Sequence, residues 1–345
     1  MAGKRRDPFT IGTVEVAAGK RVTTELPIAH LVSGTPVTLP VLVLHGRAEG
    51  PSVWVSAAIH GDELCGVEIV RRVVASLHPS AMGGTLIAVP VVNVHGFNRG
   101  DRYLPDRRDL NRAFPGSPRG SLASRVAHLL MTEVVGRCSV GIDLHTGSGH
   151  RRNLPHVRAD LDDPHTLALA EAFAPPIAVH ARLRDGSLRQ AATQSGAAVL
   201  VYEGGEALRF DEAAIERGKA GILRVLGRLG MIPAPAPADG EVLLSRRSSW
   251  LRAPRSGIVH LERGLGDRVR RGDRVGTIVD TFGKQIGRLA ARADGIVIGA
   301  TQHPLVDQGD AVLHVAEIDG GGPDGAGPEA PGGYAGSARS SDPQR

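Results

Sequence analysis

His60 and Glu63 stand three residues apart, directly after the apolar run 53–55 and just before an amphipathic segment at 64–77. Imidazole nitrogen and carboxylate oxygen are both ligands that zinc accepts, and this spacing lets both side chains reach one ion from a single turn. Taken alone, the pair could equally be a turn histidine and a carboxylate favoured by a helix N-terminus. A metal site therefore needs a third ligand and a base further along the chain.

Later motifs hold residues of the required types. They are Arg102-Tyr103 with Asp109-Leu110-Asn111-Arg112, then Asp143-Leu144-His145-Thr146-Gly147, and last Tyr202-Glu203-Gly204-Gly205. Together they offer a second histidine, a second glutamate and arginines, whose planar fork matches the shape of a carboxylate.

The elements that position these motifs are predicted from hydrophobic periodicity. We expect two to four short strands within 8–50, where apolar and polar residues alternate. The pattern then predicts buried strands at 51–58, 85–92, 140–144, 177–183 and 198–202, and helices at 64–77, 121–137, 164–174, 187–195 and 211–229. This alternation is typical of an α/β sheet with helices on both faces. The polar segment 93–120 is predicted to be a long loop, either functional or disordered.

Three candidate residues fall at equivalent places in this scheme. His60, His145 and Glu203 lie at or just beyond the C-terminal ends of predicted strands. Ligands bind at those ends in open α/β sheets. The periodicity therefore predicts that these three side chains meet at one edge of the sheet.

Changes in composition divide the chain into segments. We predict an N-terminal β-rich segment packed on the catalytic domain, the catalytic domain itself, a Pro/Ala linker, a C-terminal β domain and a disordered tail. Their boundaries are 1–50, 51–232, 233–240, 241–318 and 319–345.

An internal repeat runs through the C-terminal β domain. Gly257-Ile258-Val259 recurs as Gly295-Ile296-Val297, and each copy is followed by a Gly-Asp-x-Val turn, at 272–275 and 309–312. Two similar β halves predict a small sandwich of duplicated strands.

This domain resembles the barrel-sandwich fold of biotinyl and lipoyl carrier domains, in which the modified lysine lies in the hairpin between the halves. Lys284 stands in about that place, but Phe282, Gly283 and Gln285 differ from the acidic or Met neighbours of a carrier site. We therefore interpret the domain as an appendage that shapes or covers the active site.

The totals argue against several classes of protein. Hydrophobic content of 41% and charge of 22% are those of a soluble globular protein. No apolar run reaches the length of a membrane span, and no apolar signal segment follows the basic N-terminus. The cysteines, Cys65 and Cys138, give no disulfide framework, so we expect a cytoplasmic protein without a membrane partner. The net charge of +5 could suggest nucleic acid, but aromatics are only 3%, too few for base stacking. A small acidic substrate explains the arginines at least as well, and a homo-oligomer is left open.

Taken in their order along the chain, the motifs around His60, Arg102, His145 and Glu203 resemble those of the zinc carboxypeptidase superfamily. They resemble its aspartoacylase/succinylglutamate desuccinylase branch more closely. The resemblance covers about 50–230, where four separated motifs agree in type and order. The short gap between Glu63 and His145 and the C-terminal β domain also fit that branch. It implies a three-layer α/β/α zinc-carboxypeptidase-like sheet with a small C-terminal all-β (barrel-sandwich-like) domain.

The resemblance implies a metal centre and a base. His60, Glu63 and His145 match the ligands of one zinc ion (Zn2+) per chain, and Glu203 matches the glutamate that activates the attacking water. The chemistry agrees, because three protein ligands leave zinc an open position and zinc lowers the pKa of water to about 7. Asp143, close before His145 in the same strand, is expected on the opposite face and therefore to support another ligand.

The resemblance also implies groups that hold the substrate. Arg102 matches the arginine that polarises the scissile carbonyl, and Asn111 and Arg112 match the pair that grips the substrate carboxylate. The stretch between Arg102 and Asn111 is longer than the usual motif, so Arg107 or Arg108 could take the role given to Arg102.

Two features of the family have no clean match. For its substrate arginine just before the base, Arg189 is the best candidate, with Arg184 behind it, although a surface helix arginine is the simpler interpretation. The pair Arg151-Arg152 either binds acidic substrate or is a solvated charge pair. The other histidines, His156 among them, are interpreted mainly as surface or loop residues, and the substrate-closing tyrosine has no clear match.

These observations predict a zinc-dependent amidohydrolase that removes the acyl group from a small acidic N-acyl amino acid. A zinc carboxypeptidase acting on an acidic peptide or protein C-terminus would use the same machinery and remains an alternative. Capping of the cleft by the β domain would favour the small substrate. A non-catalytic binding protein on the same fold is a third hypothesis, against which the presence of Glu203 argues. The acyl group, the amino acid and the native metal are left open.

Overall fold

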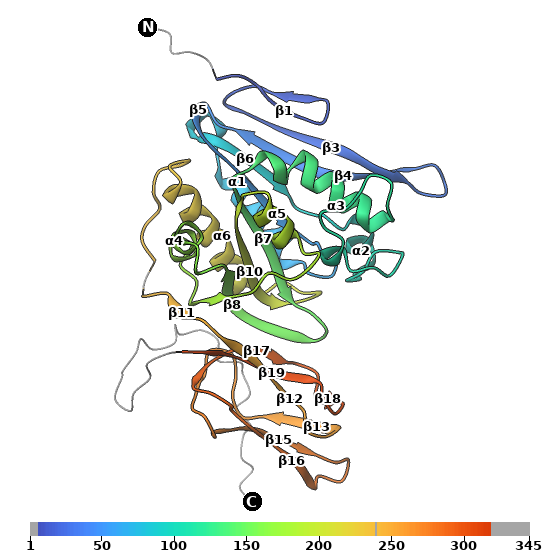
Figure 1. The fold of residues 1–345 in the computed structure, drawn as a ribbon, viewed down its shortest axis with the longest axis vertical. Coiled ribbons are helices and arrows are strands. Elements are labelled where there is room, and N and C mark those ends of the chain that lie inside the picture. Colours follow the sequence, from blue (N-terminus) through green and yellow to red (C-terminus); the bar gives the residue numbers. More distant parts are fainter. Residues whose placement is uncertain (1–5, 239, 319–345) are drawn as a thin grey trace, which may run out of the picture.

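A computed structural model describes residues 6–238 and 240–318. Its main feature is one mixed sheet of 13 strands. They are β3 (Lys20–His30), β4 (Pro36–His45), β5 (Ala48–Ala57), β6 (Gly83–Val89), β7 (Val140–Gly147), β8 (Arg151–Ala159), β9 (Ile177–His180), β10 (Ala198–Glu206), β11 (Leu243–Ser245), β12 (Ser248–Arg252), β14 (Arg268–Val269), β17 (Gly295–Thr301) and β19 (Ala311–Glu317). The order along its main path is β12-β19-β17-β8-β10-β7-β5-β6-β4-β3 (Figure 1).

Helices cover both faces of the central part of this sheet. One face packs against α1 (Cys65–Ser76), α4 (Pro164–Phe173) and α6 (Glu212–Arg228). The other packs against α2 (Val94–Arg99), α3 (Leu122–Glu133) and α5 (Leu188–Gln194). Short 3-10 turns occur at η1 (Pro79–Ala81), η2 (Leu110–Arg112) and η3 (Val135–Arg137). None of the helices in the described residues is both long and apolar enough to cross a membrane.

Alternation along the strands separates the two helical layers. In β5, Val53 and Val55 face the core under α1, whereas Trp54 between them faces the core under α3. The period of two in a strand requires this division. The predicted α/β fold with helices on both faces and an additional β region at the C-terminus is confirmed.

Most predicted elements occur within a few residues of their expected bounds, but the structure corrects others. The N-terminal segment holds β1 (Phe9–Ile11), β2 (Val14–Val16), β3 and β4, and the last two are long strands rather than short ones. Segment 93–120 includes α2 and η2, so it is not simply a loop. The short α2 has little periodicity and is set by its N-cap, where Asn93 Oδ1 accepts a hydrogen bond from Gly96 N at 2.8 Å. Strand β8 was not predicted.

The C-terminal region is a sandwich of two interlaced halves. Its second sheet has the order β16-β15-β13-β18 and consists of β13 (Gly257–Leu261), β15 (Arg274–Val279), β16 (Gln285–Ala290) and β18 (Leu305–Val306). Short strand β14 of the first half pairs with β17 of the second, while β18 of the second half pairs with β13 of the first. The predicted duplication is therefore confirmed.

The repeated turns of the two halves each contain an equivalent hydrogen bond. Arg270 N donates to Asp273 Oδ2 and Asp307 N donates to Asp310 Oδ2, both at 2.9 Å. Lys284 is exposed in the turn between β15 and β16. These two strands belong to the sheet of the sandwich that lies farther from the helical layers (Figure 1). The predicted tail at 319–345 lies outside the described residues.

The sandwich is continuous with the part of the sheet that the helices cover. Strand β17 pairs antiparallel with β8, and β11 pairs parallel with β9. A small core fills the junction, with Leu154 and Val179 from one side and Ile296 and Ile298 from the other. The C-terminal strands therefore have a fixed position relative to β8.

Replacing Gly141 tests the packing of the strand that carries His145. Gly141 is paired with Trp54, and a Cβ on this glycine would lie 1.9 Å from the indole ring. We expect Gly141→Ala to lower the free energy of unfolding by about 1–3 kcal/mol, because overpacking forces side chains to shift. Urea denaturation measures this, with Gly264→Ala as control, since a Cβ added there would meet no atom within 4 Å apart from its chain neighbours. Equal stability of the two variants would contradict the packing described here.

Candidate active site

Three parallel strands converge on the candidate site. Strands β10, β7 and β5 are neighbours in the sheet, and Glu203 and His145 are directly paired across β10 and β7. The loop that follows β5 carries His60 and Glu63. It lies against α2 so closely that a Cβ on Gly61 would be 2.0 Å from backbone of that helix. The predicted meeting of these side chains at the C-terminal ends of strands is confirmed.

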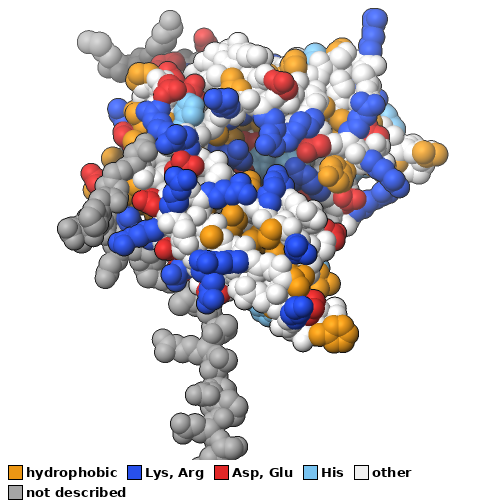
Figure 2. Space-filling view, turned by 60° about the horizontal axis from the view of Figure 1, so that its bottom comes forward, with side chains coloured by type: hydrophobic (Ala, Val, Ile, Leu, Met, Phe, Trp, Pro, Cys, Tyr) orange, Lys and Arg blue, Asp and Glu red, His pale blue; other side chains and the backbone are white. Residues whose placement is uncertain are grey.

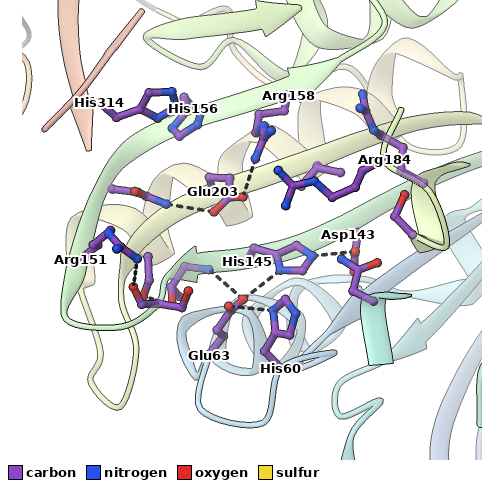
Figure 3. A pocket seen from close by; sticks show the side chains of 18 of the residues that line it. His60, Glu63, Asp143, His145, Arg151, His156, Arg158, Arg184, Glu203 and His314 are labelled. Carbon is purple, nitrogen blue, oxygen red and sulfur yellow. Dashed lines mark hydrogen bonds and ion pairs between the residues drawn. The ribbon is translucent and has the colours of Figure 1, made fainter. Parts of the chain in front are cut away.

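The proposed ligands form a compact cluster. One ligand atom from each of His60, Glu63 and His145 lies within 4.8 Å of the others, and all three residues are buried. His60 Nδ1 lies 2.8 Å from Glu63 Oε1, and His145 Nδ1 lies 2.9 Å from Glu63 Oε2 (Figure 3). Two imidazole nitrogens and one carboxylate suit zinc, and catalytic zinc sites commonly have three protein ligands.

Second carboxylates orient both imidazoles. His60 Nε2 lies 3.1 Å from Asp109 Oδ1, and His145 Nε2 lies 2.7 Å from Asp143 Oδ2. Such pairs favour the tautomer with the proton on Nε2, which leaves Nδ1 free to bind a metal. Ser56 Oγ in turn donates to Asp143 Oδ1 at 2.8 Å.

The expected position of Asp143 was wrong. It supports His145 itself and not another ligand. One residue, Leu144, lies between Asp143 and His145, so both side chains point to the same face of strand β7.

Glu63 is ionised despite its burial. Burial raises the pKa of its carboxyl, but His60 and His145 outweigh this and hold the pKa well below its usual range. Thr146 N also donates to Glu63 Oε2 at 3.1 Å. The cluster therefore presents the charged carboxylate that a cation requires.

Glu203 lies beside this cluster in an environment that favours a proton acceptor. Its side chain is 13% exposed, and burial raises the pKa of its carboxyl. Asn153 Nδ2 donates to its Oε2 at 3.0 Å, and an Arg158 nitrogen lies 3.5 Å from its Oε1. Both partners belong to β8, which runs antiparallel beside β10.

Arg102, Asn111 and Arg112 all line the same cavity. Arg102 contacts Glu63 Oε1 at 3.3 Å and Asp109 Oδ2 at 3.1 Å. Asn111 Oδ1 accepts from Leu188 N at 2.9 Å, which ties this segment to the start of α5. The alternatives Arg107 and Arg108 are exposed and do not line the cavity.

Arginines concentrate at one end of the cavity. Arg189 is not a surface residue, since it is 8% exposed and its Nη2 donates to the carbonyls of Ala181 and Arg182. Its Nη1 is buried without a hydrogen-bond partner among the described residues. Burial, with Arg158 and Arg184 nearby, lowers the pKa of Arg189 to about 10. Such a cluster of like charges favours an anionic ligand.

The whole cavity has a volume of about 450 Å³. Figure 2 shows it as a hollow with histidine inside and basic side chains around its rim. The arginines that line it are Arg102, Arg112, Arg151, Arg158, Arg182, Arg184 and Arg189, against the acidic residues Glu63, Asp143 and Glu203.

The C-terminal domain forms part of the cavity wall, through Ser248, Trp250 and His314. The rings of Trp250 and His314 stack at 4.5 Å. His156 of β8 also lines the cavity and is buried, so it is not a surface or loop residue. Of the arginine pair at the start of β8, Arg151 lines the cavity and Arg152 binds Asp211 at 2.7 Å.

The contribution of β8 and of the C-terminal strands to the cavity was not predicted from the sequence. The available signal was Leu154 and Val157 among polar residues shortly after His145, which is typical of a strand returning from a hairpin. Nothing in the sequence marked Trp250 or His314, because their place depends on the pairing of β17 with β8.

Comparison with known proteins gives consistent matches. The model of the succinylglutamate desuccinylase/aspartoacylase catalytic domain matches residues 49–229. The chain is 28% identical over 309 residues to the N-alpha-acetyl-L-2,4-diaminobutyric acid deacetylase of Halomonas elongata, which covers 85% of this chain and 90% of that protein. It is 34% identical over 107 residues to the succinylglutamate desuccinylase of Burkholderia cenocepacia, covering 28% and 30% of the respective chains.

Solved structures agree over most of the chain. A succinylglutamate desuccinylase/aspartoacylase from Rhodobacter sphaeroides is 30% identical with a TM-score of 0.78, covering 91% of this chain and 97% of that one. The product-bound ectoine utilization protein EutE (DoeB) from Ruegeria pomeroyi is 25% identical with a TM-score of 0.78, covering 91% and 96%. Both relatives therefore include the C-terminal β region as well as the catalytic part.

Removing one imidazole tests the metal cluster. We expect His145→Ala to lose most of its zinc, because two ligands hold the ion much less tightly than three. Metal analysis after dialysis measures this, with His165→Ala, an exposed histidine of α4, as control. A His145→Ala protein that retained zinc at the wild-type ratio would remove this residue from the ligand set.

His156 should make the fold sensitive to acid. Burial lowers the pKa of this histidine to about 4, whereas the unfolded chain binds the proton below its ordinary pKa of 6.5. The contribution of neutral His156 to the free energy of unfolding is therefore fully present above pH 6.5 and is lost as the pH falls towards 4. We expect this residue to account for about 2 kcal/mol between pH 7.5 and 4.5.

Denaturant unfolding of wild type and His156→Gln at both pH values measures this contribution, with chelator present so that metal release does not add to it. The variant should lose less stability between the two pH values. The control His165→Gln should lose as much as wild type, and parallel losses in all three proteins would contradict the burial of a neutral His156.

Proposed function

Because the chain belongs to the succinylglutamate desuccinylase/aspartoacylase family, we propose that it is a zinc-dependent hydrolase that removes the acyl group from a small acidic N-acyl amino acid. One observation carries the proposal. The mostly buried Glu203 of β10 is paired with His145 on the neighbouring strand β7, and both line the cavity that holds the His60–Glu63–His145 cluster. A three-ligand cluster with a protected carboxylate beside it is the arrangement that water activation needs.

His60, Glu63 and His145 would hold the ion. Bound there, zinc would act as a Lewis acid that lowers the pKa of water and polarises a carbonyl. Asp109 and Asp143 would keep the two imidazoles in the orientation this requires.

Glu203 would act as the general base and then as the acid. It takes a proton from the attacking water, whose oxygen bonds to the amide carbon. The C–N bond then breaks, and Glu203 returns the proton to the leaving nitrogen, so the products are a carboxylate and a free amino acid. Asn153 and Arg158 hold the carboxylate in place for both transfers.

Arg102 is assigned to the oxygen of the scissile amide. Its guanidinium lies against Glu63 at the centre of the cavity, where negative charge develops on that oxygen. Interactions with developing charge contribute most to catalysis.

Asn111, Arg112 and Arg189 are assigned to the amino-acid half of the substrate, with Arg184 beside them. None of these three arginines forms an ion pair with a carboxylate of a described residue. Their positive charge favours an acidic amino acid over one whose side chain carries an ammonium group. The Halomonas elongata relative is named for a substrate of the second kind, a diaminobutyric acid derivative.

A release assay on the zinc-loaded protein tests the function. It compares N-acetyl, N-succinyl and N-formyl derivatives of acidic amino acids with peptides that have acidic C-termini. We expect turnover of N-acyl amino acids only, because β12 and β19 close one wall of a cavity of about 450 Å³, the size of a small-molecule pocket. Turnover of peptides only would replace the proposal with a carboxypeptidase.

Glu203→Gln tests the base in the same assay. We expect it to keep its zinc and to lose at least 100-fold in kcat, the lower range for a general base. Glu206→Gln is the matched control, because Glu206 lies on the same strand but does not line the cavity. Full activity in Glu203→Gln would end this assignment.

A further inference from the structure

The cavity has two ends on opposite sides of the catalytic centre. In Figure 3, Arg184 lies on one side of His145 and Glu203, and Arg151 lies on the other. A substrate whose amide is held at the centre must extend its two halves in opposite directions. Since the proposed function assigns the amino-acid half to the end that holds Arg184, the acyl half extends towards Arg151.

The side chain of Arg151 is fixed by both domains. Its Nε donates to Ala311 O of β19 at 3.3 Å, and its Nη1 donates to Ser148 O at 3.4 Å. Its guanidinium carbon lies 5.4 Å from the centroid of the Trp250 ring, a distance at which a cation and an aromatic face attract each other. The guanidinium therefore has its orientation before any ligand binds.

The charge of Arg151 is not neutralised. No described carboxylate lies within ion-pair distance of it, whereas its neighbour Arg152 pairs with Asp211 at 2.7 Å. An oriented guanidinium in a cavity is suited to a carboxylate, which it can bind through charge-assisted hydrogen bonds.

The wall of the cavity beside Arg151 is formed by two uncharged side chains, Trp250 and His314. Trp250 and His314 are partners in the pairing of β12 with β19, and their rings are nearly parallel at 10°. Burial lowers the pKa of His314 to about 3, so its ring is neutral near pH 7. The uncharged side chains that line this part of the cavity suit methylene groups, while Arg151 beside them suits a terminal anion.

We propose that Arg151, Trp250 and His314 form the acyl subsite and select an acyl group with a distal carboxylate, such as a succinyl group. This inference rests on the deacylase function proposed above. An acetyl group would leave the charge of Arg151 unmatched, so we expect this chain to prefer another acyl group than the one in the name of the Halomonas elongata relative, which is an N-acetyl compound.

The test compares three substrates that share the amino acid selected by the release assay and carry an N-succinyl, N-butanoyl or N-acetyl group. The butanoyl group keeps the chain length and lacks the carboxylate. We expect kcat/KM to be at least tenfold higher for the succinyl compound. Arg151→Gln should remove about 10- to 100-fold of that value, as expected for a charged hydrogen bond, and change the other two substrates less than threefold.

Two further variants complete the set. Trp250→Leu should weaken the succinyl and butanoyl substrates together and spare the acetyl one. Arg252→Gln is the control, because Arg252 lies on the same strand, is exposed and donates to Gly309 O outside the cavity. It should leave all three substrates unchanged.

Binding supplies a second readout that does not need turnover. In zinc-loaded Glu203→Gln protein, adding Arg151→Gln should raise the Kd of the succinyl compound about tenfold and leave that of the acetyl compound unchanged. Efficient hydrolysis without preference for the succinyl compound, or equal effects of Arg151→Gln on all three, would overturn the acyl subsite and leave the deacylase standing. Failure to hydrolyse any N-acyl amino acid would overturn the proposed function, and with it this inference.

Discussion

The carboxylate of Glu63 is the group on which the rest of the site depends. It is 2% exposed, and a charge at that depth is stable only when it is fully paired. His60 and His145 approach its two oxygens, Thr146 donates a backbone N–H, and Arg102 lies 3.3 Å away. These partners come from three separate parts of the chain. Pairing this one charge therefore brings together the loop after β5, the end of β7 and the segment before η2.

The second constraint is the pairing of β8 with β10. Strand β8 folds back beside it and places Asn153 and Arg158 against Glu203. Strand β17 then pairs with β8, so the C-terminal sandwich begins where the catalytic sheet would otherwise end. This continuity is why Trp250 and His314, more than 100 positions after His145 in the chain, share a cavity with it. The C-terminal domain is part of the site and not only a cover over it.

The cavity combines cationic walls with an anionic centre. Glu63, Asp143 and Glu203 are each engaged by histidine, serine, asparagine or arginine, whereas Arg112, Arg151 and Arg189 have no carboxylate partner among the described residues. Of these, Arg189 is buried close to Arg158 and Arg184, and like charges in such a place repel one another. An acidic substrate would offset this repulsion.

Sequence periodicity predicted the main helices and the parallel strands well, since each buries a face whose spacing is readable locally. It failed at α2, where an asparagine cap and not an apolar stripe begins the helix, and at β8, whose apolar residues are broken by Pro155 and charged neighbours. Asp143 lies two positions before His145, so the period of two in a strand puts both side chains on one face of β7 and makes their contact readable from the sequence.

The residues that can carry the chemistry were predictable from residue type and order alone, since His60, Glu63, His145 and Glu203 already limit the donor set. The groups that surround them depend on how the strands and loops fold together. Asp109, Asn153 and Arg158 reach the site through hydrogen bonding between strands and loops distant in the chain, and Trp250 and His314 reach it through a second domain. Such long-range pairing is set by the register and order of strands, which local patterns of hydrophobicity do not encode.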